Sequence, residues 1–539
     1  MSRRNASGQV NLYNEVRPGQ SVGEAALILQ QPRAADVTAM RDSTLAVLSR
    51  ANFEALLIRY PLALSRVFAQ ANFHWVRDVR KVVEQRYAHS VVVIGLHDGI
   101  GAHEVADCLA KAFARCGRMH HFQPPQDNAT EAAVFDVDRQ NELDEQFDFL
   151  VYEAGPGLSP WARRAFRQAD QVVFVASMGA LTSLGPLERG FMEEPGFPMK
   201  RKHLVLLHSA TATVPGDVGS WRDESRFERV YPIRSRHQGD FSRLSRFLTG
   251  SAVGVVLGGG GARGFAHVGV LQALEEAGVP VDLVGGNSMG ALIGAQYVCG
   301  VSLADILTQT QRFAAGGERL TLPLISIVSG RRVERDLKSM FGDITIERLW
   351  RPFFAAACNL TKGVTTAQDT GLLWRAVLAS NSPAGLFPPV LHKGQLLVDG
   401  AILDNVPVEA MRMRLGTALE KRRGNGTIIA IDVGVPDALR VDPSLARLSP
   451  WHTLASFLPG TRTSPGIGDI LYSAGHVGSV SQRARTMAQS DHYLEPPVAG
   501  FSLMGYKHAQ AISEVGYRYA QEKIAQWKQL NSAPWEVVQ

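Results

Sequence analysis

A serine that lies between two glycines is the residue of this 539-residue chain best suited to nucleophilic chemistry. Ser288 is the centre of the segment 286–290, which reads GNSMG. The segment 281–285 before it predicts a strand, and the run 291–295 after it predicts a helix. A G-x-S-x-G segment between a strand and a helix is typical of a nucleophile elbow, a sharp turn that exposes the serine hydroxyl. We therefore predict that Ser288 is a nucleophile at the positive end of a helix.

A glycine-rich loop ends 22 residues before this segment. Residues 258–264 read GGGGARG and directly follow the apolar run 252–257, which predicts a buried strand. Taken alone, the G-x-G-x-x-G spacing within the loop fits a dinucleotide site, with Asp282 available to hold a ribose. A tight strand-to-helix turn without a ligand fits equally well, so the loop by itself leaves both interpretations open.

A serine nucleophile needs a group that accepts its proton. The histidines that follow it have no distinctive loop context; they are His392, His452, His476, His492 and His508. Asp399, by contrast, ends a predicted strand and begins an Asp-Gly-Ala turn, 111 residues after the serine. Burial beside the hydroxyl would raise the pKa of this carboxylate and orient it as a base. An ordinary Asp-Gly hairpin turn is the alternative interpretation.

Strands and helices alternate along the chain after about residue 90. Helix patterns at 104–116 and 160–168 separate short apolar runs that predict strands, and the last stretch, 505–529, has apolar residues at helical spacing. This alternation predicts an α/β fold, with parallel sheets covered on both faces. The apolar runs before the glycine-rich loop are 91–95, 149–152, 172–176 and 204–207.

The first 62 residues follow another pattern. Alternating segments at 36–40 and 45–48 predict short strands, and Ser49 or Asn52 is suited to cap a helix that runs to Ile58. A stretch rich in Arg, Val and Phe at helical spacing follows and predicts a helical connector. The N-terminal zone is therefore expected to be rich in β-structure and separate from the α/β zones.

Composition excludes several classes of protein. Lys and Arg exceed Asp and Glu by 56 to 51, a net charge of +5 that is too small to argue for a nucleic-acid partner. The four cysteines show no CxxC spacing and no His/Cys cluster, so neither a disulfide scaffold nor a structural metal site is expected. No apolar run approaches about 18 residues, so we expect no transmembrane helix. The N-terminus also lacks the pattern of a signal peptide.

The three motifs, in this order, resemble the patatin-like phospholipase family over about residues 253–410. The common elbow of the family has threonine before the serine, where this chain has Asn287. The resemblance implies a three-layer α/β/α hydrolase domain. It also implies a dyad in which Ser288 is the nucleophile and Asp399 the proton acceptor, with no catalytic histidine, no metal and no other cofactor.

The resemblance also gives roles to the residues around the dyad. The glycine-rich loop would form an oxyanion hole rather than a nucleotide site, with the N–H groups of Gly260, Gly261 and Met289 as donors. Arg263 at its edge either holds the loop or attracts a phosphate headgroup. The expected site residues are Gly259, Gly260, Gly261, Arg263 and Gly264 in the loop, and Gly286, Met289 and Gly290 in the elbow.

Outside this region the chain is similar to the bacterial neuropathy-target-esterase-like branch of the family. Residues 147–152 and 160–164 resemble its pre-lipase segment, and the turn 95–102 lacks the Lys-Ser/Thr of a P-loop. Four N-terminal residues resemble a cyclic-nucleotide cassette, in which Glu binds the ribose hydroxyl and Arg the cyclic phosphate: Gly23, Glu24, Arg33 and Ala34. About 20 residues precede Gly23, too few for the missing strands, so we expect weak cyclic-nucleotide binding or none.

The resulting division of the chain has five parts. We expect a partial cyclic-nucleotide-binding-like segment, a helical connector, a Rossmann-like α/β middle domain without a P-loop lysine, a patatin-like catalytic domain, and a C-terminal part that completes the catalytic domain with a terminal helix. Their expected boundaries are 1–62, 63–89, 90–248, 253–412 and 413–539.

These observations favour a serine esterase that hydrolyses acyl esters of phospholipids or lysophospholipids through an acyl-enzyme. A regulatory protein that responds to cyclic nucleotides and has little esterase activity is the alternative. A nucleotide-dependent oxidoreductase is a weaker rival, because it would make the elbow and the Asp-Gly-Ala turn coincidences. We expect peripheral membrane contact and no nucleic-acid partner. The expected location is the cytoplasm or the inner face of the membrane.

Overall fold

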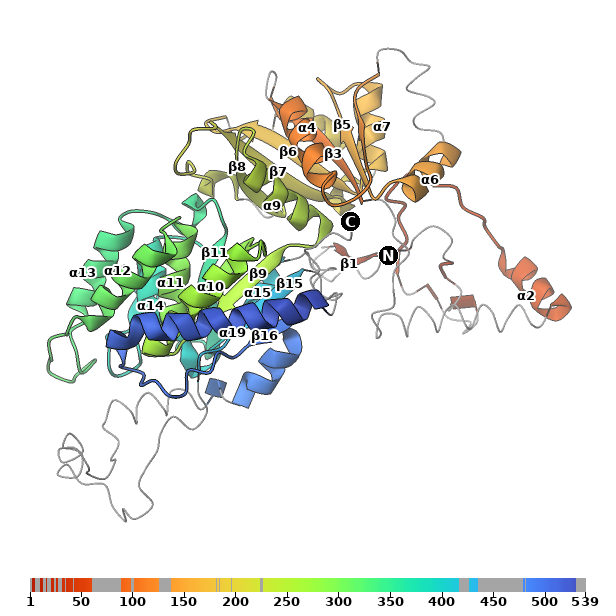
Figure 1. Ribbon diagram of the computed structural model, residues 1–539. Helices are drawn as coiled ribbons and strands as arrows, with labels where there is room; N and C mark the ends of the chain where they lie inside the picture. The colour runs from red at the N-terminus through yellow and green to blue at the C-terminus, as the bar shows by residue number, and fades with distance from the viewer. Residues whose placement is uncertain are drawn as a thin grey trace. The chain divides into compact units, whose positions relative to one another are not determined.

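Two units with separate sheets make up the chain in the computed structural model (Figure 1). Unit 1 comprises residues 1–212, 220–248 and 417–424, and unit 2 comprises residues 213–219, 249–416 and 425–539. The structure describes residues 2–4, 10–12, 16, 21–23, 26–27, 32–33, 35–41, 43–60, 89–97, 101–125, 137–415 apart from 181, 184, 195 and 223–225, then 426–434, 478–479 and 481–529.

The N-terminal zone of unit 1 contains little regular structure among its described residues. Strand β1 (Ser2–Arg4) pairs with β2 (Val10–Leu12) in an antiparallel ribbon. Helix α2 (Arg50–Arg59) begins after Ser49, whose side chain accepts a hydrogen bond from the Asn52 N–H at 3.3 Å, as the capping pattern predicted. The strands predicted at 36–40 and 45–48 are wrong, because neither segment forms a strand: Asp36 makes only a single β-bridge, and Leu45 and Val47 face solvent.

A six-stranded parallel sheet forms the rest of unit 1, and it confirms the predicted α/β pattern. Its spatial order is β4-β5-β3-β6-β7-β8, so the third strand along the chain, rather than the second, lies beside the first. This order differs from that of a dinucleotide-binding sheet. The predicted connector, 63–89, lies outside the described residues except for His89, which begins β3.

The strands of this sheet are β3 (His89–Gly95), β4 (Met119–Phe122), β5 (Phe149–Glu153), β6 (Gln171–Ser177), β7 (Arg201–His208) and β8 (Arg229–Arg234). Its helices are α4 (Ala102–Phe113), α6 (Val137–Gln146), α7 (Pro160–Gln168), α8 (Pro186–Met192) and α9 (Gln238–Thr249), with short 3-10 turns at Phe197–Met199 and Gly219–Trp221.

Unit 2 is built on a mixed sheet whose central strands are parallel. The order is β13-β14-β11-β10-β9-β15-β16, and β12 also pairs with β11. Strands β12, β13 and β14 are antiparallel to their neighbours and form one side of the sheet. The strands are β9 (Val253–Leu257), β10 (Leu283–Asn287), β11 (Phe353–Asn359), β12 (Val364–Gln368), β13 (Val390–His392), β14 (Gln395–Asp399), β15 (Thr427–Ile431) and β16 (His492–Leu494).

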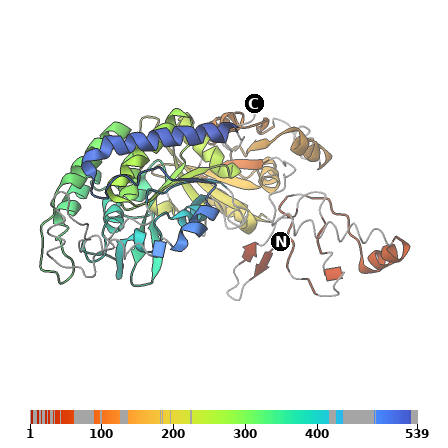
Figure 2. The same ribbon diagram turned by 60° about the horizontal axis from the view of Figure 1, so that its bottom comes forward.

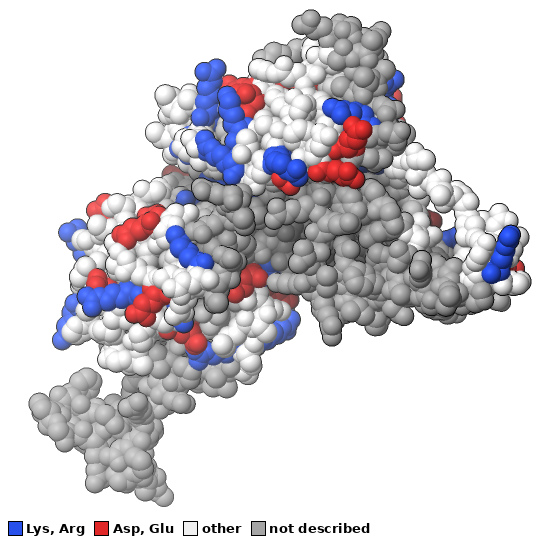
Figure 3. All heavy atoms as spheres, turned by 45° about the vertical axis from the view of Figure 1, so that its right-hand side comes forward, with Lys and Arg blue, Asp and Glu red and all other residues white. Residues whose placement is uncertain are grey.

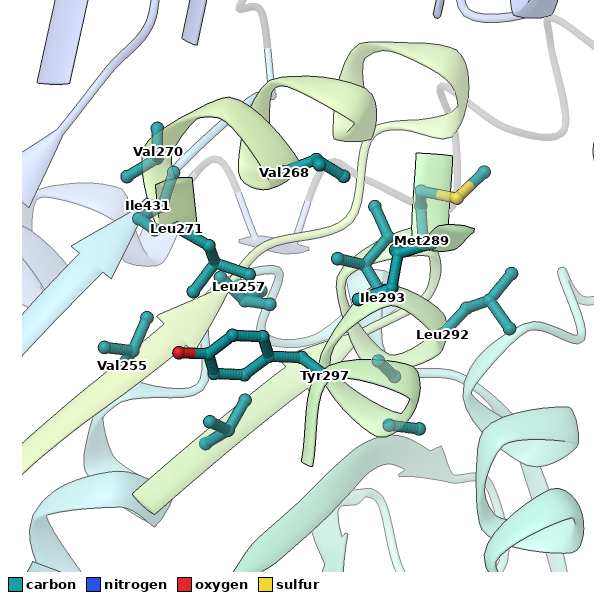
Figure 4. Packing of buried hydrophobic residues seen from close by; sticks show 14 of the residues in the cluster. Val255, Leu257, Val268, Val270, Leu271, Met289, Leu292, Ile293, Tyr297 and Ile431 are labelled. Atoms are coloured by element: carbon teal, nitrogen blue, oxygen red, sulfur yellow. The ribbon is translucent and has the colours of Figure 1, made fainter. Parts of the chain in front are cut away.

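Helices cover both faces of this sheet. Val255 and Leu257 of β9 pack against Leu271 of α10 and Ile293 of α11 in the main core (Figure 4). On the other face, a Cβ atom on Gly254 would lie 2.3 Å from the sulfur of Met411 in α15, so that helix packs directly on the strand. Unit 2 is therefore a three-layer α/β/α domain, as expected.

The helices of unit 2 are α10 (Ala266–Glu276), α11 (Met289–Val298), α12 (Leu303–Ala315), α13 (Arg331–Phe341), α14 (Leu373–Ser380), α15 (Val408–Leu415) and α19 (Ala509–Gln529). Short 3-10 helices are η3 (Gly261–Phe265), η4 (Ile346–Arg348), η5 (Gly400–Ile402) and η6 (Tyr506–His508).

The C-terminal helix α19 lies along α10 (Figures 1 and 2). A Cβ atom on Gly269 would lie 1.9 Å from the Ser513 carbonyl oxygen, and one on Gly516 would lie 2.2 Å from that of Ala266. Two glycines therefore allow the backbones of these helices to approach closely. Ile512 and Ile524 bury the apolar face that the sequence predicted for this helix.

The surface shown in Figure 3 carries basic and acidic side chains in small interspersed groups. No broad field of one sign is visible among the described residues on this face. No described helix is long and apolar enough to cross a membrane.

Candidate active site

The predicted nucleophile lies on a strained turn between β10 and α11. Ser288 has φ +51° and ψ −125°, a conformation that is costly for a residue with a side chain. A Cβ atom on Gly290 would lie 2.1 Å from the Leu257 carbonyl oxygen, and one on Gly286 would lie 2.6 Å from the carbonyl carbon of Gly290. Only glycine fits at these two positions, which agrees with a nucleophile elbow.

Two residues at the end of α14 hold this strained turn. The Ser288 N–H donates to the Ser380 hydroxyl at 2.8 Å, and the Ser288 carbonyl accepts from the Asn381 side chain at 2.9 Å. Sequence reasoning missed both residues, because they lie more than 90 positions away and no motif surrounds them. They satisfy backbone groups that the strained turn leaves without helical partners.

Asp399 ends β14 and is 5% exposed. Its Oδ1 accepts the Ala401 N–H at 3.0 Å and the Asn287 side-chain amide at 3.4 Å. Its own N–H donates to the Ser382 carbonyl at 2.9 Å, which fixes the strand end. The carboxylate is therefore buried and oriented next to the residue that precedes the serine.

Strand register brings the two predicted dyad residues to the same level of the sheet. Asn287 of β10 pairs with Ala356 of β11, and Ala357 of β11 pairs with Asp399. Ser288, the residue after Asn287, therefore lies on one side of β11, and Asp399 lies on the other side. Two strand spacings, roughly 10 Å, separate their backbones.

The glycine-rich loop lies against the nucleophile. A Cβ atom on Gly259 would lie 3.1 Å from the Cβ of Ser288. Asn405 clamps this glycine from both sides: its Oδ1 accepts the Gly259 N–H at 3.1 Å, and its Nδ2 donates to the Gly259 carbonyl at 3.1 Å. The Gly259 N–H is therefore used in holding the loop. Sequence reasoning missed Asn405, since nothing in its immediate sequence marks it.

The predicted oxyanion donors come next along the loop. Among the described residues, the N–H groups of Gly260 and Gly261 have no hydrogen-bond partner. The following N–H, of Ala262, donates to the Leu503 carbonyl at 2.8 Å. Met289 begins α11, where the first backbone N–H groups have no partner within the helix. These three N–H groups are therefore available to a developing negative charge.

Arg263 holds the loop rather than extending into solvent. Its side chain is 6% exposed, and its Nε donates to the Phe501 carbonyl at 2.8 Å. A Cβ atom on Gly264 would lie 2.4 Å from Cγ of Met289, so loop and elbow pack closely. Of the two roles considered for this arginine, the structure favours the anchoring one.

His267 supports the same loop from within α10. The ring is fully buried, and its Nε2 donates to the Gly258 carbonyl at 2.7 Å. Burial lowers the pKa of His267 to about 4, so the ring is neutral at pH 7. Within the described part of the chain, the Nδ1 atom has no hydrogen-bond partner, which is consistent with a neutral ring that carries its proton on Nε2. In the sequence, the only feature that singles out His267 is its position three residues after the glycine-rich loop.

This histidine predicts a loss of stability in acid. Its folded-state pKa lies below the unfolded value of 6.5, so the unfolded chain binds the extra proton as pH falls from about 6.5 toward 4. Between pH 7 and pH 5 the free energy of unfolding of unit 2 should fall by about 2 kcal/mol from this group. Urea unfolding at pH 7 and pH 5 measures this change in the free energy of unfolding for the wild type and for His267→Gln. The variant should lose the part of the change that comes from His267.

The exposed His508→Gln serves as the control and should keep the wild-type pH dependence. An equal pH dependence in wild type and His267→Gln would contradict the assignment.

Two of the histidines considered as bases, His392 and His492, lie far from the elbow in the sheet. His392 lies in β13 and His492 in β16, each three strands from β10 and on opposite sides of it. Three strand spacings correspond to roughly 14 Å. His508 lies in η6, and His452 and His476 lie outside the described residues.

The structure argues against a dinucleotide site at the glycine-rich loop. Asp282, the residue considered for a ribose, is buried, and its Oδ2 accepts the Val253 N–H at 3.0 Å. Val253 begins β9, whereas the loop follows the end of that strand, about 13 Å away along it. Among the described residues, no group of three or more His, Cys, Asp or Glu side chains is arranged to hold a metal ion.

The predicted cyclic-nucleotide cassette is only partly described. Glu24 and Ala34 lie outside the described residues, while Gly23 and Arg33 lie within them. A Cβ atom on Gly23 would lie 1.3 Å from Nη1 of Arg33, so the guanidinium packs against this glycine. Arg33 is otherwise exposed.

Three family models match the chain. They are described as "Patatin-like phospholipase" over residues 255–412, "Neuropathy Target Esterase family P-loop like domain" over residues 140–231, and "Cyclic nucleotide-binding domain" over residues 1–60. The first contains the elbow, the glycine-rich loop and the Asp-Gly-Ala turn.

Curated relatives match nearly the whole chain. "Neuropathy target esterase sws" of Drosophila melanogaster is 30% identical over 95% of this chain and 39% of its own length. "Patatin-like phospholipase domain-containing protein 6" of Homo sapiens is 29% identical over 97% and 42%. "Lysophospholipase nte1" of Neosartorya fischeri is 28% identical over 97% and 40%. The chain thus spans about two fifths of the length of these relatives.

One solved structure, VipD from Legionella pneumophila, overlaps 52% of this chain and 76% of its own at 13% identity. Its TM-score is 0.23, which is too low to inform the fold.

Proposed function

Since residues 255–412 form a patatin-like phospholipase domain in a chain related to the neuropathy target esterases, we propose that this protein is a serine esterase of phospholipid or lysophospholipid acyl chains. The observation that carries the proposal is the arrangement of the elbow. Ser288 lies on a strained turn at one side of β11, and the buried Asp399 lies at the same level on the other side.

In the first half of the proposed reaction, the Ser288 hydroxyl attacks the ester carbonyl while Asp399 takes its proton. The carbonyl oxygen becomes an oxyanion and accepts hydrogen bonds from the N–H groups of Gly260, Gly261 and Met289. Collapse of this intermediate breaks the bond to the alcohol oxygen, which takes the proton from Asp399. The products of this half are the free alcohol and an acyl-serine.

In the second half, Asp399 takes a proton from a water molecule as the water oxygen attacks the acyl-serine carbonyl. The same N–H groups hold the new oxyanion. Its collapse breaks the bond to Ser288, which regains the proton, and releases the fatty acid. The loop contacts of Asn405, Arg263 and His267 keep the donors in place through both halves.

Fatty-acid release by the purified full chain tests this function. Relatives named lysophospholipase make lysophosphatidylcholine the first substrate to assay, with diacyl phosphatidylcholine beside it. The wild type should release fatty acid from one or both, and Ser288→Ala from neither. Hydrolysis that persists in Ser288→Ala would contradict the proposal.

Activity should not depend on a metal. Backbone N–H groups polarise the carbonyl in the proposed reaction, so no Lewis acid has a step to perform. Rates measured before and after dialysis against EDTA should agree, and added calcium should not be required. A stoichiometric metal whose removal abolishes turnover, and whose return restores it, would contradict this prediction.

A regulatory protein that responds to cyclic nucleotides remains the second candidate, because residues 1–60 match the cyclic nucleotide-binding family model. The described residues between 13 and 60 form no strand to enclose a base, and the Arg33 guanidinium packs on Gly23. We therefore expect this chain to bind cAMP and cGMP weakly or not at all. Micromolar binding in calorimetry that disappears in Arg33→Ala would contradict this expectation and favour the second candidate.

Peripheral membrane contact and a cytoplasmic location are part of the same proposal. Because the substrate lies in a bilayer, we expect the protein to bind the membrane surface. Salt or mild detergent should then release it from membranes. Extraction only by detergents that dissolve the bilayer would contradict it.

A further inference from the structure

The connection between α12 and α13 in unit 2 carries an unusual exposed apolar loop. Leu320, Leu322, Leu324 and Ile325 are each between 73% and 88% exposed. In Figure 1 this connection is the green loop at the lower left, beyond the ends of the two helices. Four large aliphatic side chains within six residues form a patch that a soluble domain normally covers.

The base of this loop is fixed. Leu320 pairs with Val328 in an antiparallel bridge, and the Thr321 N–H donates to the Ile327 carbonyl at 3.0 Å. The Ser326 hydroxyl donates to the Val328 carbonyl at 2.7 Å. The aliphatic side chains are therefore held in solvent by a short hairpin-like base.

The same base is tied to the candidate active site. The Ile327 N–H donates to the Gly385 carbonyl, and the Val328 N–H to that of Leu386, both at 3.0 Å. Three residues before Gly385, the Ser382 carbonyl accepts the N–H of Asp399. A surface that contacts this loop therefore contacts an element rigidly connected to the dyad.

A surface hollow of about 390 Å³ lies beside the loop base. Ser329 and Gly330, which follow the loop, line one part of it, and Ser382 lines another. Trp374 and Phe387 contribute apolar rings to its wall, and Glu334 and Arg375 contribute charged side chains. The hollow is therefore a mixed apolar and polar surface beside the loop, and Ser288 and Asp399 do not line it.

The chemistry of the loop selects a lipid surface over a protein partner. Residues 320–328 contain no charged side chain, and the exposed Arg319 and Arg331 flank them. Aliphatic side chains bordered by cations are suited to the boundary between acyl chains and anionic headgroups. Protein interfaces are enriched in aromatic residues and Met, and this loop contains neither.

We propose that residues 320–325 insert into the lipid bilayer and hold the catalytic domain at the membrane surface. The choice of partner rests on the proposed function, since a phospholipid esterase must reach substrate in a bilayer. The insertion itself does not require turnover, so it is measured separately from catalysis.

Vesicle binding of the full chain tests the proposal. The variant replaces Leu322, Leu324 and Ile325 with serine, and the matched control replaces Leu45, Val47 and Ile58, which are equally exposed in the N-terminal zone of unit 1. Both are measured with wild type by co-sedimentation with phosphatidylcholine vesicles that contain phosphatidylglycerol. All three proteins carry Ser288→Ala, so substrate turnover has no influence on binding.

The loop variant should bind vesicles at least about tenfold more weakly than wild type, because it loses the burial of three aliphatic side chains. The control should bind as wild type does. Arg319→Gln combined with Arg331→Gln should weaken binding to vesicles that contain phosphatidylglycerol and leave binding to pure phosphatidylcholine unchanged. Leu324→Trp should show a blue-shifted emission on vesicles.

Equal vesicle binding by the loop variant and wild type would overturn the proposal. So would a wild-type dimer, seen in ultracentrifugation, that the loop variant breaks, because a second copy would then cover the loop. With Ser288 restored, the loop variant should hydrolyse a soluble short-chain ester at the wild-type rate. If wild type hydrolyses no ester but still inserts, the proposed function fails and this inference stands.

Discussion

Ser288→Ala should lower kcat for a soluble ester by roughly 10⁴–10⁶-fold, and Asp399→Asn should have an effect of similar order. The two side chains act on one proton transfer, so the double variant should be no slower than the worse single one. Asparagine keeps an oxygen that accepts the Ala401 N–H, so Asp399→Asn should fold. Hydrolysis of 4-nitrophenyl butyrate, with far-ultraviolet circular dichroism, measures both rate and folding.

Ser382→Ala provides a control next to the dyad. Ser382 contacts Asp399 through its backbone carbonyl, and its hydroxyl donates to Leu378, so alanine keeps the contact that matters. This variant should retain most activity. A folded His392→Ala or His492→Ala that loses all turnover would show that a histidine is the base and that the dyad is wrong.

Asn405→Ala should lower kcat by roughly 10²–10³-fold while KM stays close to the wild-type value. The substitution removes both side-chain hydrogen bonds that hold Gly259 and leaves only the longer backbone bond to the Asn405 carbonyl, so the donors of Gly260 and Gly261 lose their fixed position. These donors act on the oxyanion rather than on the bound ester, so the loss should fall on kcat. Asn405 is thus a positioning residue, and steady-state kinetics with the soluble ester tests it.

Asn359→Ala separates positioning from stability. Asn359 is fully buried in the same sheet, and its Oδ1 accepts the N–H groups of Thr361 and Lys362 at the turn between β11 and β12. Its loss should destabilise the domain without changing kcat in the folded protein. If both variants lower kcat equally, Asn405 has only a structural role.

The sequence predicted those parts of the site that are local in the chain. The elbow around Ser288 and the glycine-rich loop each require a strand, a turn and a helix within about 20 residues. The glycines that these turns require can be read directly from the sequence. The helix at 160–168 and the strand at 91–95 were recognised for the same reason, since their apolar patterns are local.

The parts that depend on distant pairing were not visible. Ser380 and Asn405 contact the elbow and the loop only after the sheet has formed, and neither lies in a distinctive local pattern. Strand order in both sheets is likewise set by packing between segments far apart in the chain. Alternation misled at 45–48, because a period of two indicates a strand only where a neighbour exists to pair with it.

The glycine-rich loop is held by chain that is synthesised much later. The Phe501 and Leu503 carbonyls anchor Arg263 and Ala262, and α19 closes over α10 behind them. On a translating ribosome, the elbow and its supports at Ser380 and Asn381 therefore emerge more than 100 residues before the last supports of the loop. The order of synthesis therefore delays a fully supported candidate site until the C-terminal segment has emerged.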